Sequence, residues 1–497
     1  IEKYLDYILT HQQEDGWLGP QQSSSRSGNY KPRDPWPVFV ILKVFTQYHE
    51  ATGDPRVLPA MQRFLRCLEI QLAERPLFDW NKFRWQDLVL SIHWLYDRTG
   101  EDWLLDLAAT AREQGYDWLQ HFKDLPYKQR VKFWMFESHV VNTAMAVKAP
   151  GVWFRQSGTA PDRDAVYAGL AQLDEYHGQA TGLFTGDECL AGRMPSQGTE
   201  LCAVVEFMYS LEMLAGLLGD PVFADRLERI TFNALPATFS PDMWAHQYDQ
   251  QANQVVCKVS DPNVYATNGP DANLFGLEPN YGCCTANMHQ GWPKFAAHLW
   301  MRARDGGLAA IAYAPCVVKS VVHDAATEIA VETNYPFSEE ITINVSVDRP
   351  VTFALHLRIP GWTKDATVQL GEERAAPVTS GQFQVITREW TGSTRLILRL
   401  PMPVRIERRY NDAVAIHRGP LVYSLKIGED WRHLRGDMPH ADWEVHPTTP
   451  WNYALELDPD NPEKSLQFIE GDMSENPFSP ESAPVRATVQ GDRKSVV

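Results

Sequence analysis

Apolar side chains recur every three to four residues through most of the first 300 residues, a period typical of amphipathic helices. Ile1, Leu5, Ile8 and Leu9 mark the first apolar face. Longer stretches with the same period follow. They predict helices at 37–51, 55–74, 83–98, 101–121, 134–148, 161–175, 199–218, 220–234 and 285–304.

Three of the connections between these helices share one pattern. They read ATGDPRVLPAM at 51–61, RTGEDWLLDLA at 98–108 and LLGDPVFADRL at 217–227. In each, a glycine ends one helix and an acidic residue precedes the next. Helical hairpins repeated at roughly 45 residues predict a solenoid or a closed helical toroid. The segments 176–198 and 235–284 are rich in Gly, Pro, Asn and Asp, and we expect them to be loops that line a pocket.

From about residue 306 the period changes to two. Segments such as TEIAVETNYP, EITINVSV and VTFALHLRIPGW alternate apolar and polar residues between turn signals, which predicts an antiparallel β-sandwich. We therefore expect a helical domain over 1–304, a β-sandwich over 305–412, and a second, small or truncated β region over 413–497.

Composition narrows the classes of partner. The chain has 497 residues and a net charge of −17, so it would repel phosphate backbones, and a nucleic-acid partner is not expected. No uninterrupted apolar run of about 18 residues is present, so no membrane partner is expected either. The first residues carry no charged segment followed by an apolar one. The sequence does not determine the compartment, although the cytoplasm is weakly favoured. A homodimer is possible.

The seven cysteines do not fit a disulfide framework, because their number is odd and the chain is long. Cys283 and Cys284 are adjacent, and a disulfide between neighbours is strained, so two thiols presented together suit a metal better. Cys189 is interpreted as a loop residue. We expect the remaining cysteines outside the metal motif to pack as small apolar side chains: Cys67, Cys257 and Cys316.

The strongest chemical signal is a pair of segments, GTELCAVVEF at 198–207 and NYGCCTANMHQGWPKF at 280–295. Glu200 and Cys202 stand at the start of one predicted helix, and Cys283 and Cys284 precede the start of another. A helix N-terminus stabilises a thiolate. Three sulfurs and one carboxylate match tetrahedral zinc, although unrelated buried cysteines remain the alternative.

These segments resemble glycoside hydrolase family 127, the β-L-arabinofuranosidase family, over roughly residues 1–420. The resemblance rests on EDGWLGP (14–20), RWQDLVLSIHWLY (84–96), SHVVN (138–142), GDECLAGRMPSQGTELC (186–202), WAHQYDQQAN (244–253) and NYGCCTAN (280–287). It implies a helical (α/α)6 barrel as the catalytic domain, followed by antiparallel β-sandwich domains. Because the chain begins at Ile1, we expect the barrel to lack its first helices.

The resemblance also implies the site residues. Zn²⁺ would be held by Glu200, Cys202, Cys283 and Cys284, and Cys283 would act as the nucleophile of a retaining mechanism. Glu188 would be the acid/base, with Asp187 as its rival. His139 and Tyr248 would contact the substrate. His93 is either a sugar ligand or a core histidine, because it stands on an apolar helix face.

The function that this implies is a zinc-dependent retaining exo-glycosidase acting on an oligosaccharide or glycoside, which releases terminal β-L-arabinofuranose from plant-type glycans. One alternative is a helical-barrel sugar epimerase or lyase, in which His or Tyr would carry the chemistry. Another is a non-catalytic carbohydrate-binding protein with structural zinc. Thr285 and Ala286 stand where family members often have prolines, which leaves another furanoside open as substrate.

Overall fold

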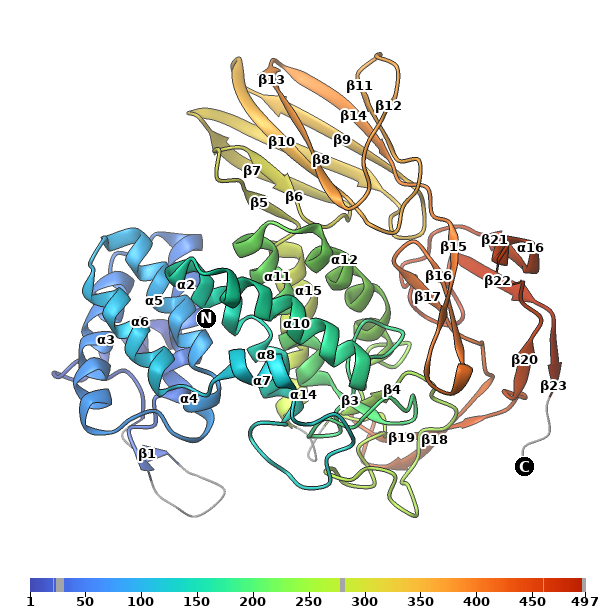
Figure 1. Cartoon of the computed structure of the whole chain (residues 1–497), viewed down its shortest axis with the longest axis horizontal. Helices are drawn as coiled ribbons and strands as arrows, with labels where there is room; N and C mark the ends of the chain where they lie inside the picture. Colours follow the sequence, from blue (N-terminus) through green and yellow to red (C-terminus); the bar gives the residue numbers. More distant parts are fainter. Residues whose placement is uncertain (21, 24–30, 278–281, 459, 494–497) are drawn as a thin grey trace. The chain divides into compact units, whose positions relative to one another are not determined.

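The computed structural model describes residues 1–20, 22–23, 31–277, 282–458 and 460–493 (Figure 1). The chain divides into two compact units, and each is described by itself. The first comprises Ile1–Pro126 and Met135–Gln172, and the second comprises Tyr127–Trp134 and Leu173–Val497.

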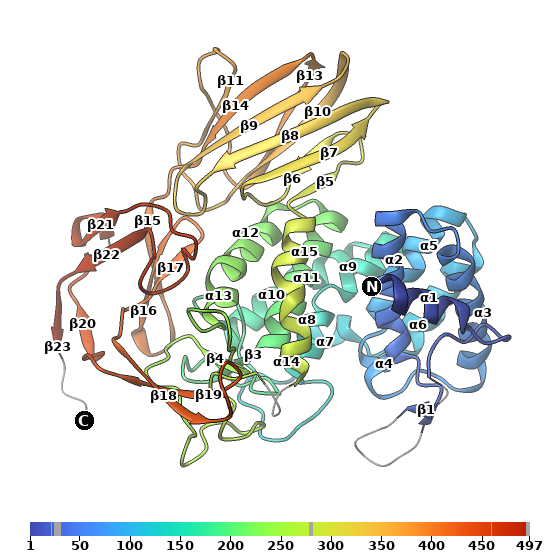
Figure 2. The same ribbon diagram turned by 180° about the vertical axis from the view of Figure 1, so that it is seen from behind.

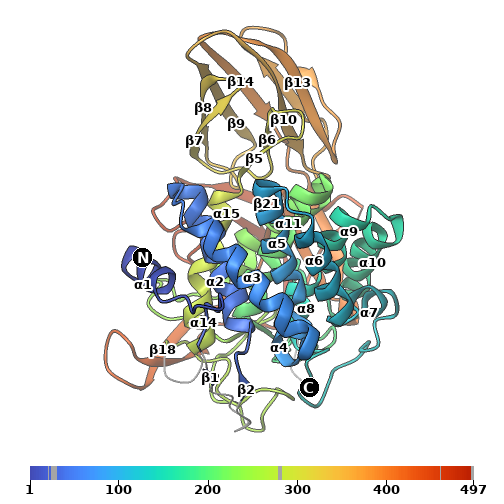
Figure 3. The same cartoon turned by 90° about the vertical axis from the view of Figure 1, so that its left-hand side faces the viewer.

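The first unit is helical. Its helix α5 contacts α2, α3, α6 and α9 (Figure 3). This helix buries an apolar face that includes Trp85, Leu88 and Ile92. The elements are α1 (Glu2–Thr10), β1 (Gln22–Ser23), β2 (Lys31–Pro32), α2 (Trp36–Thr52), α3 (Val57–Glu74), α4 (Asp79–Phe83), α5 (Trp85–Thr99), α6 (Trp103–Gln114), α7 (Trp118–Asp124), α8 (Val140–Ala146), α9 (Ala149–Ser157) and α10 (Ala160–His177), whose last residues belong to the second unit.

Glycine ends the helices where the sequence predicted it. Gly53 and Gly100 cap α2 and α5 with a φ of 68°, and each donates its N–H to the carbonyl four residues earlier. A side chain would be strained in this left-handed conformation, so glycine is preferred there. An acidic residue begins a helix in the third of the repeated connections. Asp220, at the start of the helix predicted at 220–234, accepts a hydrogen bond from Val222 N–H, as expected for an acidic N-cap.

Helix α11 forms the centre of the helical part of the second unit and contacts α12, α14 and α15 (Figure 2). By length and composition α11 could cross a membrane, but 78% of it is buried inside the protein, as in a core helix. The elements are β3 (Gly198–Glu200), α11 (Leu201–Leu218), α12 (Pro221–Arg229), the π-helical turn η1 (Ile230–Ala234), α13 (Leu235–Ala237), β4 (Asp249–Gln251), α14 (Gly282–Asn287), η2 (Met288–Gln290) and α15 (Gly291–Ala297).

A β-sandwich follows these helices. One sheet has the order β13-β10-β6-β5 and the other β12-β11-β14-β9-β8-β7 (Figure 1). Buried and exposed residues alternate along β8, as the period of two predicted. Pairing is antiparallel except between β6 and β10. The strands are β5 (Trp300–Arg302), β6 (Leu308–Ala310), β7 (Cys316–Val322), β8 (Ala325–Thr333), β9 (Glu340–Val347), β10 (Val351–Ile359), β11 (Thr367–Leu370), β12 (Ala376–Pro377), β13 (Gln382–Trp390) and β14 (Ser393–Arg399).

The rest of the chain forms a group of small antiparallel sheets. Strand β19 returns to the helical part, where Val445 bridges Cys257 and Trp443 bridges Phe275. The elements are β15 (Val404–Arg408), η3 (Tyr410–Asp412), β16 (Val414–Arg418), β17 (Leu421–Tyr423), β18 (Glu429–Arg435), β19 (Asp442–Pro447), β20 (Tyr453–Leu455), α16 (Pro462–Ser465), β21 (Leu466–Glu470), β22 (Val485–Val489) and β23 (Gly491–Arg493). The domain limits at 304 and 412 stay predictions.

Three of the predicted helices differ from the helices of the structure by more than one helical turn. The helix predicted at 101–121 is interrupted at Gly115, after which Asp117 caps α7. The segment 134–148 becomes helical only at Val140, where His139 is the N-cap. The helix predicted to reach 304 ends at Ala297, because Trp300–Arg302 pairs with β6 instead. In each case a cap or a strand partner outweighs the local helical period.

Candidate active site

Glu200 and Cys202 lie at a change from strand to helix. Glu200 ends β3, pairs with Asp249 of β4, and is the N-cap of α11, while Cys202 lies in the first turn of that helix. The strands approach closely, since a Cβ on Gly198 would come within 2.6 Å of Asp249 Cγ. Glycine at 198 therefore lets the two strands pair, and this pairing fixes where Glu200 begins the helix.

Cys283 and Cys284 lie inside the first turn of α14, and not before a helix as the sequence predicted. The two residues differ in burial, because Cys284 is buried and Cys283 is exposed. The Thr285 hydroxyl lies 2.8 Å from Leu277 O and 2.9 Å from His246 Nε2, and these two contacts hold the start of α14. Asn280 and Tyr281 of the same motif lie outside the described residues.

The two segments bring together one carboxylate and three thiols. Ligand atoms of Glu200, Cys202, Cys283 and Cys284 all lie within 4.8 Å of one another. Cys284 Sγ lies 3.7 Å from Cys202 Sγ and 4.0 Å from Cys283 Sγ. Tetrahedral zinc with Zn–S bonds of about 2.3 Å places its sulfurs about 3.8 Å apart. The cluster therefore has the donor set and the spacing for such an ion.

Burial and hydrogen bonding also fit a cation at this cluster. Glu200 Oε2 is buried, and among the described residues it has no hydrogen-bond partner. Burial raises the pKa of the carboxyl of Glu200 and of the thiol of Cys284. Hydrogen bonds from the thiols of Cys202 and Cys284 hold the pKa of Cys283 far below its usual value. Cys283 is thus the cysteine of the cluster that ionises most readily.

Glu188 lies beside the cluster. A carboxylate oxygen of Glu188 lies within 4.8 Å of one from Glu200. Its loop is joined to β3, because Gly186 N–H donates to Gly198 O at 2.8 Å and Gly186 O accepts from Glu200 N–H at 3.1 Å. Glu188 is half-buried and accepts from Trp134 Nε1–H at 3.1 Å on Oε2 and from the Tyr248 hydroxyl on Oε1.

Asp187, the alternative acid/base, binds backbone N–H groups through one of its carboxylate oxygens. It is fully buried, and its Oδ2 accepts from Ala266 N–H at 2.7 Å and from Thr267 N–H at 3.2 Å. These bonds tie the 266–267 turn to the Glu188 loop, which is a structural task. The geometry therefore favours Glu188 over Asp187 as the acid/base.

Tyr248 is buried near both Glu188 and Cys283. Its carbonyl accepts from Leu201 N–H at 2.9 Å, which fixes the residue next to the start of α11. Burial, followed by the charges of Glu200 and Glu188, raises the pKa of its hydroxyl. Tyr248 is also among the hydrogen-bonding groups that lower the pKa of Cys283. The hydroxyl therefore stays protonated, and its single hydrogen is donated either to Glu188 or to Cys283, not to both at once.

Comparison with protein families decides the identity of the chain. Residues 1–297 match the family model of the β-L-arabinofuranosidase GH127 catalytic domain, and residues 307–402 match that of the GH127 middle domain. The chain belongs to glycoside hydrolase family 127. It is a β-L-arabinofuranosidase-like glycoside hydrolase, as the sequence predicted, so the epimerase or lyase and the non-catalytic binding protein are set aside.

Solved structures of family 127 share the fold of the chain. A GH127 β-L-arabinofuranosidase from Geobacillus stearothermophilus T6 is 17% identical, with a TM-score of 0.65 over 90% of this chain and 84% of that one. Another GH127 β-arabinofuranosidase is also 17% identical, with a TM-score of 0.60 over 90% and 81%. The predicted fold class, a helical barrel followed by antiparallel β-sandwich domains, is confirmed. No protein with curated function matched the sequence.

The two histidines expected to bind substrate in this family 127 member lie in the first unit. His139 caps α8, where its Nδ1 accepts from Asn142 N–H at 3.3 Å, and its ring packs edge-on against Trp80. His93 is buried on α5, with Nε2 3.1 Å from Gln156 Oε1 of α9. These contacts fit the alternative that His93 is a core histidine. The substrate contacts of both histidines stay predictions.

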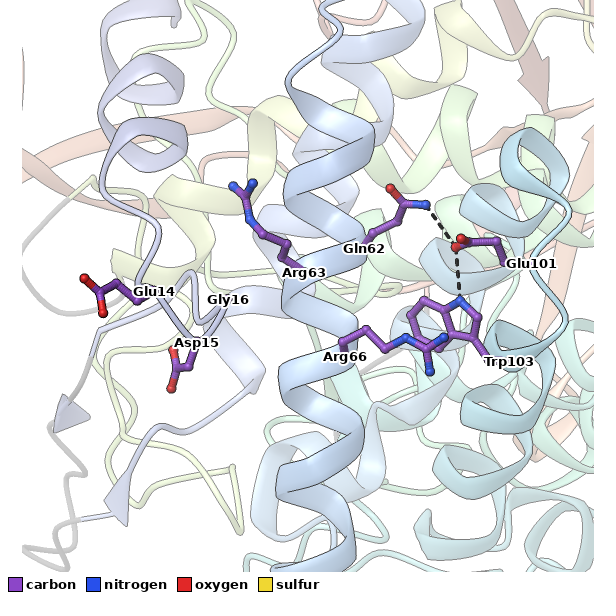
Figure 4. A pocket seen from close by; sticks show the side chains of 8 residues that line it. All are labelled: Glu14, Asp15, Gly16, Gln62, Arg63, Arg66, Glu101 and Trp103. Carbon is purple, nitrogen blue, oxygen red and sulfur yellow. Dashed lines mark hydrogen bonds between the residues drawn. The ribbon is translucent and has the colours of Figure 1, made fainter.

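An open groove of about 410 Å³ also lies in the first unit, next to the EDGWLGP segment of the family resemblance (Figure 4). Four of its lining side chains contact one another. Glu101 Oε2 accepts from Gln62 Nε2–H at 2.9 Å and from Trp103 Nε1–H at 3.0 Å, and the Arg66 guanidinium covers the Trp103 ring at 3.5 Å.

Sequence reasoning missed three residues around this family 127 site. Trp134 donates to Glu188, His246 holds Thr285, and Asn287 Nδ2–H donates to Cys202 Sγ at 3.1 Å. Asn287 and His246 lie inside the motifs that carried the resemblance, but Trp134 lies outside them. No local pattern marks Trp134, because its partner is 54 residues away.

Proposed function

We propose that this family 127 member is a zinc-dependent retaining exo-glycosidase that releases terminal β-L-arabinofuranose from plant-type glycans. Cys283 is the nucleophile and Glu188 the acid/base. The observation that carries the proposal is a cluster of one glutamate and three cysteines in which Cys283 is the one exposed residue, with Glu188 beside it. A purely structural site is closed by four protein ligands and needs no acid/base next to it, so the feature that favours catalysis is the adjacent Glu188.

In the first step Glu188 gives its proton to the glycosidic oxygen while the Cys283 thiolate attacks the anomeric carbon. The C–O bond breaks, a C–S bond forms, and the leaving group departs as an alcohol. In the second step the Glu188 carboxylate takes a proton from water, whose oxygen attacks the anomeric carbon as the C–S bond breaks. Two inversions give net retention, as in glycosidases that use two carboxylates.

The metal would be held by Glu200, Cys202, Cys283 and Cys284. Zinc keeps coordinating thiols deprotonated at neutral pH and fixes the direction of their lone pairs. The protein supplies the rest. Cys202 and Cys284 are buried anchors, Asn287 donates to Cys202 Sγ, and the β3–β4 pairing orients Glu200.

The proposed reaction predicts the anomer that is released first. We expect hydrolysis of p-nitrophenyl β-L-arabinofuranoside, in a panel of aryl glycosides, to yield β-L-arabinofuranose before mutarotation. Proton NMR during the first minutes measures the anomer. Initial release of the α-anomer would contradict a covalent intermediate on Cys283, and turnover of only another sugar would overturn the substrate.

The cluster also predicts the metal content. We expect about one zinc per chain in the purified protein, and large losses in Cys202→Ser and Cys284→Ser, because each removes a thiolate from a four-donor set. Elemental analysis measures this. Cys316→Ser is the matched control, since Cys316 lies on β7 outside the cluster. Full zinc occupancy in both cluster variants would contradict the assignment of Cys202 and Cys284 as ligands.

A further inference from the structure

We propose that Phe133 and Trp134 form the leaving-group subsite, in which the Trp134 N–H orients the acid/base and the two aromatic rings contact the sugar that departs. This inference rests on the proposed function, because it takes Glu188 as the acid/base. It adds residues to which neither the sequence motifs nor the metal cluster assigned a role.

Trp134 acts first on the acid itself. The Glu188 carboxyl has donors on both oxygens, Trp134 Nε1–H at 3.1 Å on Oε2 and the Tyr248 hydroxyl on Oε1. An indole N–H can only donate, so this bond strengthens as Glu188 loses its proton and becomes charged. An interaction that is stronger in the transition state than in the bound substrate accelerates the step.

The segment that carries the two rings is fixed to the Glu188 loop. Residues Tyr127–Trp134 belong to the second unit although the chain on either side does not. Val131 N–H donates to Leu190 O at 2.9 Å, and the Arg130 guanidinium lies 3.9 Å from Asp187 Oδ2. The segment is therefore held next to the Glu188 loop, and the Trp134 ring is fixed by its own bond to Glu188, with Phe133 adjacent to it in the chain.

The rings are also open to a ligand. Phe133 is 77% exposed and Trp134 is 42% exposed. A general acid must come within hydrogen-bond reach of the glycosidic oxygen, so the leaving sugar lies next to Glu188 during proton transfer. Aromatic residues are enriched at binding surfaces, and the faces of two neighbouring rings suit the C–H surface of a sugar ring. The occupant expected at these rings is therefore the leaving-group glycosyl unit.

Three substrates of the intact enzyme separate the two roles. The p-nitrophenyl β-L-arabinofuranoside needs little protonation, the methyl glycoside needs protonation but has no leaving ring, and a β-L-arabinofuranosyl disaccharide needs protonation and has a leaving ring. We expect Trp134→Phe to lower kcat/KM about tenfold for the methyl glycoside and the disaccharide, and less than about twofold for the aryl glycoside. Phe133→Ala should lower kcat/KM several-fold for the disaccharide alone. Trp134→Leu should add a disaccharide-specific loss to the loss shared with the methyl glycoside.

Trp451→Leu is the control, since Trp451 is a similarly exposed tryptophan outside the site, and we expect it to change none of the three ratios. Equal losses on all three substrates in the Trp134 variants would show a merely structural role. If kcat/KM for the methyl glycoside and for the disaccharide falls by the same factor in every variant, the two rings do not contact the leaving sugar. Wild-type enzyme that releases no arabinose from any of the three would overturn the proposed function and this subsite with it.

Discussion

A Cys283→Ser variant is expected to lose roughly 10⁵–10⁶-fold in kcat toward p-nitrophenyl β-L-arabinofuranoside, since removal of the nucleophile has a cost of this order in another hydrolase. A serine hydroxyl stays neutral where a thiolate would be charged, so it cannot attack the anomeric carbon at a useful rate. Steady-state rates at saturating substrate measure the loss. Cys316→Ser, in the β-sandwich, should retain wild-type rates.

Because Cys283 is also a proposed zinc ligand, a lost rate alone does not separate the two roles. A bromoacetamide derivative of the sugar does, since a thiolate displaces its bromide and forms a stable thioether. We expect alkylation at Cys283, which is exposed, and not at Cys202 or Cys284, which are buried. Peptide mass spectrometry identifies the site, and free L-arabinose should suppress the labelling.

The labelling result has two contrary outcomes. Modification of Cys284 or Cys202 would exchange the roles within the cluster. No labelling by a reagent that binds, in an enzyme that turns over substrate, would argue for a mechanism without a cysteine nucleophile.

Replacement of Glu188 by glutamine should have the next largest effect, and it should depend on the leaving group. General acid catalysis contributes about 10²–10⁴-fold. We expect a loss of that size in kcat/KM for methyl β-L-arabinofuranoside and the disaccharide, but only a small one for the p-nitrophenyl glycoside, whose leaving group needs little protonation. Glutamine keeps the size of the side chain, so the positions of Trp134 and Tyr248 should change little.

The second step offers an independent test of Glu188. Water needs a base to attack the intermediate, whereas azide does not, so added azide should restore kcat of Glu188→Gln on the aryl glycoside and yield the β-glycosyl azide. Glu14→Gln, which changes an exposed carboxylate of the first unit, is the matched control and should respond to neither test. If Glu188→Gln keeps the wild-type ratio between substrates, the role passes to Asp187.

The role of Asp187 can be distinguished from that of Glu188 by the effect of its replacement on the free energy of unfolding. Its Oδ2 accepts two backbone N–H groups of the 266–267 turn while fully buried, so Asp187→Ala removes the acceptor of both and should lower the free energy of unfolding, measured by chemical denaturation. Unpaired buried N–H groups carry a cost of about 1–3 kcal/mol each. Asp187 is thereby expected to act on folding, and Glu188 on chemistry.

The sequence by itself determined the features that depend on neighbouring residues. A glycine such as Gly53 or Gly100 ends a helix through its own backbone freedom, and Asp220 begins one through a bond to a residue two positions later. The alternation along β8 reflects a sheet with one buried face. These energies are local, so the pattern alone predicts them. The donor set Glu200, Cys202, Cys283 and Cys284 was also readable, but only because it lies in two recognisable motifs.

Only the tertiary structure decided which of these groups meet and which face solvent. Cys202 and Cys284 are 82 residues apart, and their 3.7 Å contact follows from the packing of α11 against α14. Cys283 and Cys284 are chemically identical neighbours, and the turn of α14 alone exposes one and buries the other. Trp134 reaches Glu188 because its segment pairs with Leu190 O, a contact without any periodic signal. Such contacts depend on loop paths and packing, which are set by long-range burial and not by the order of adjacent residues.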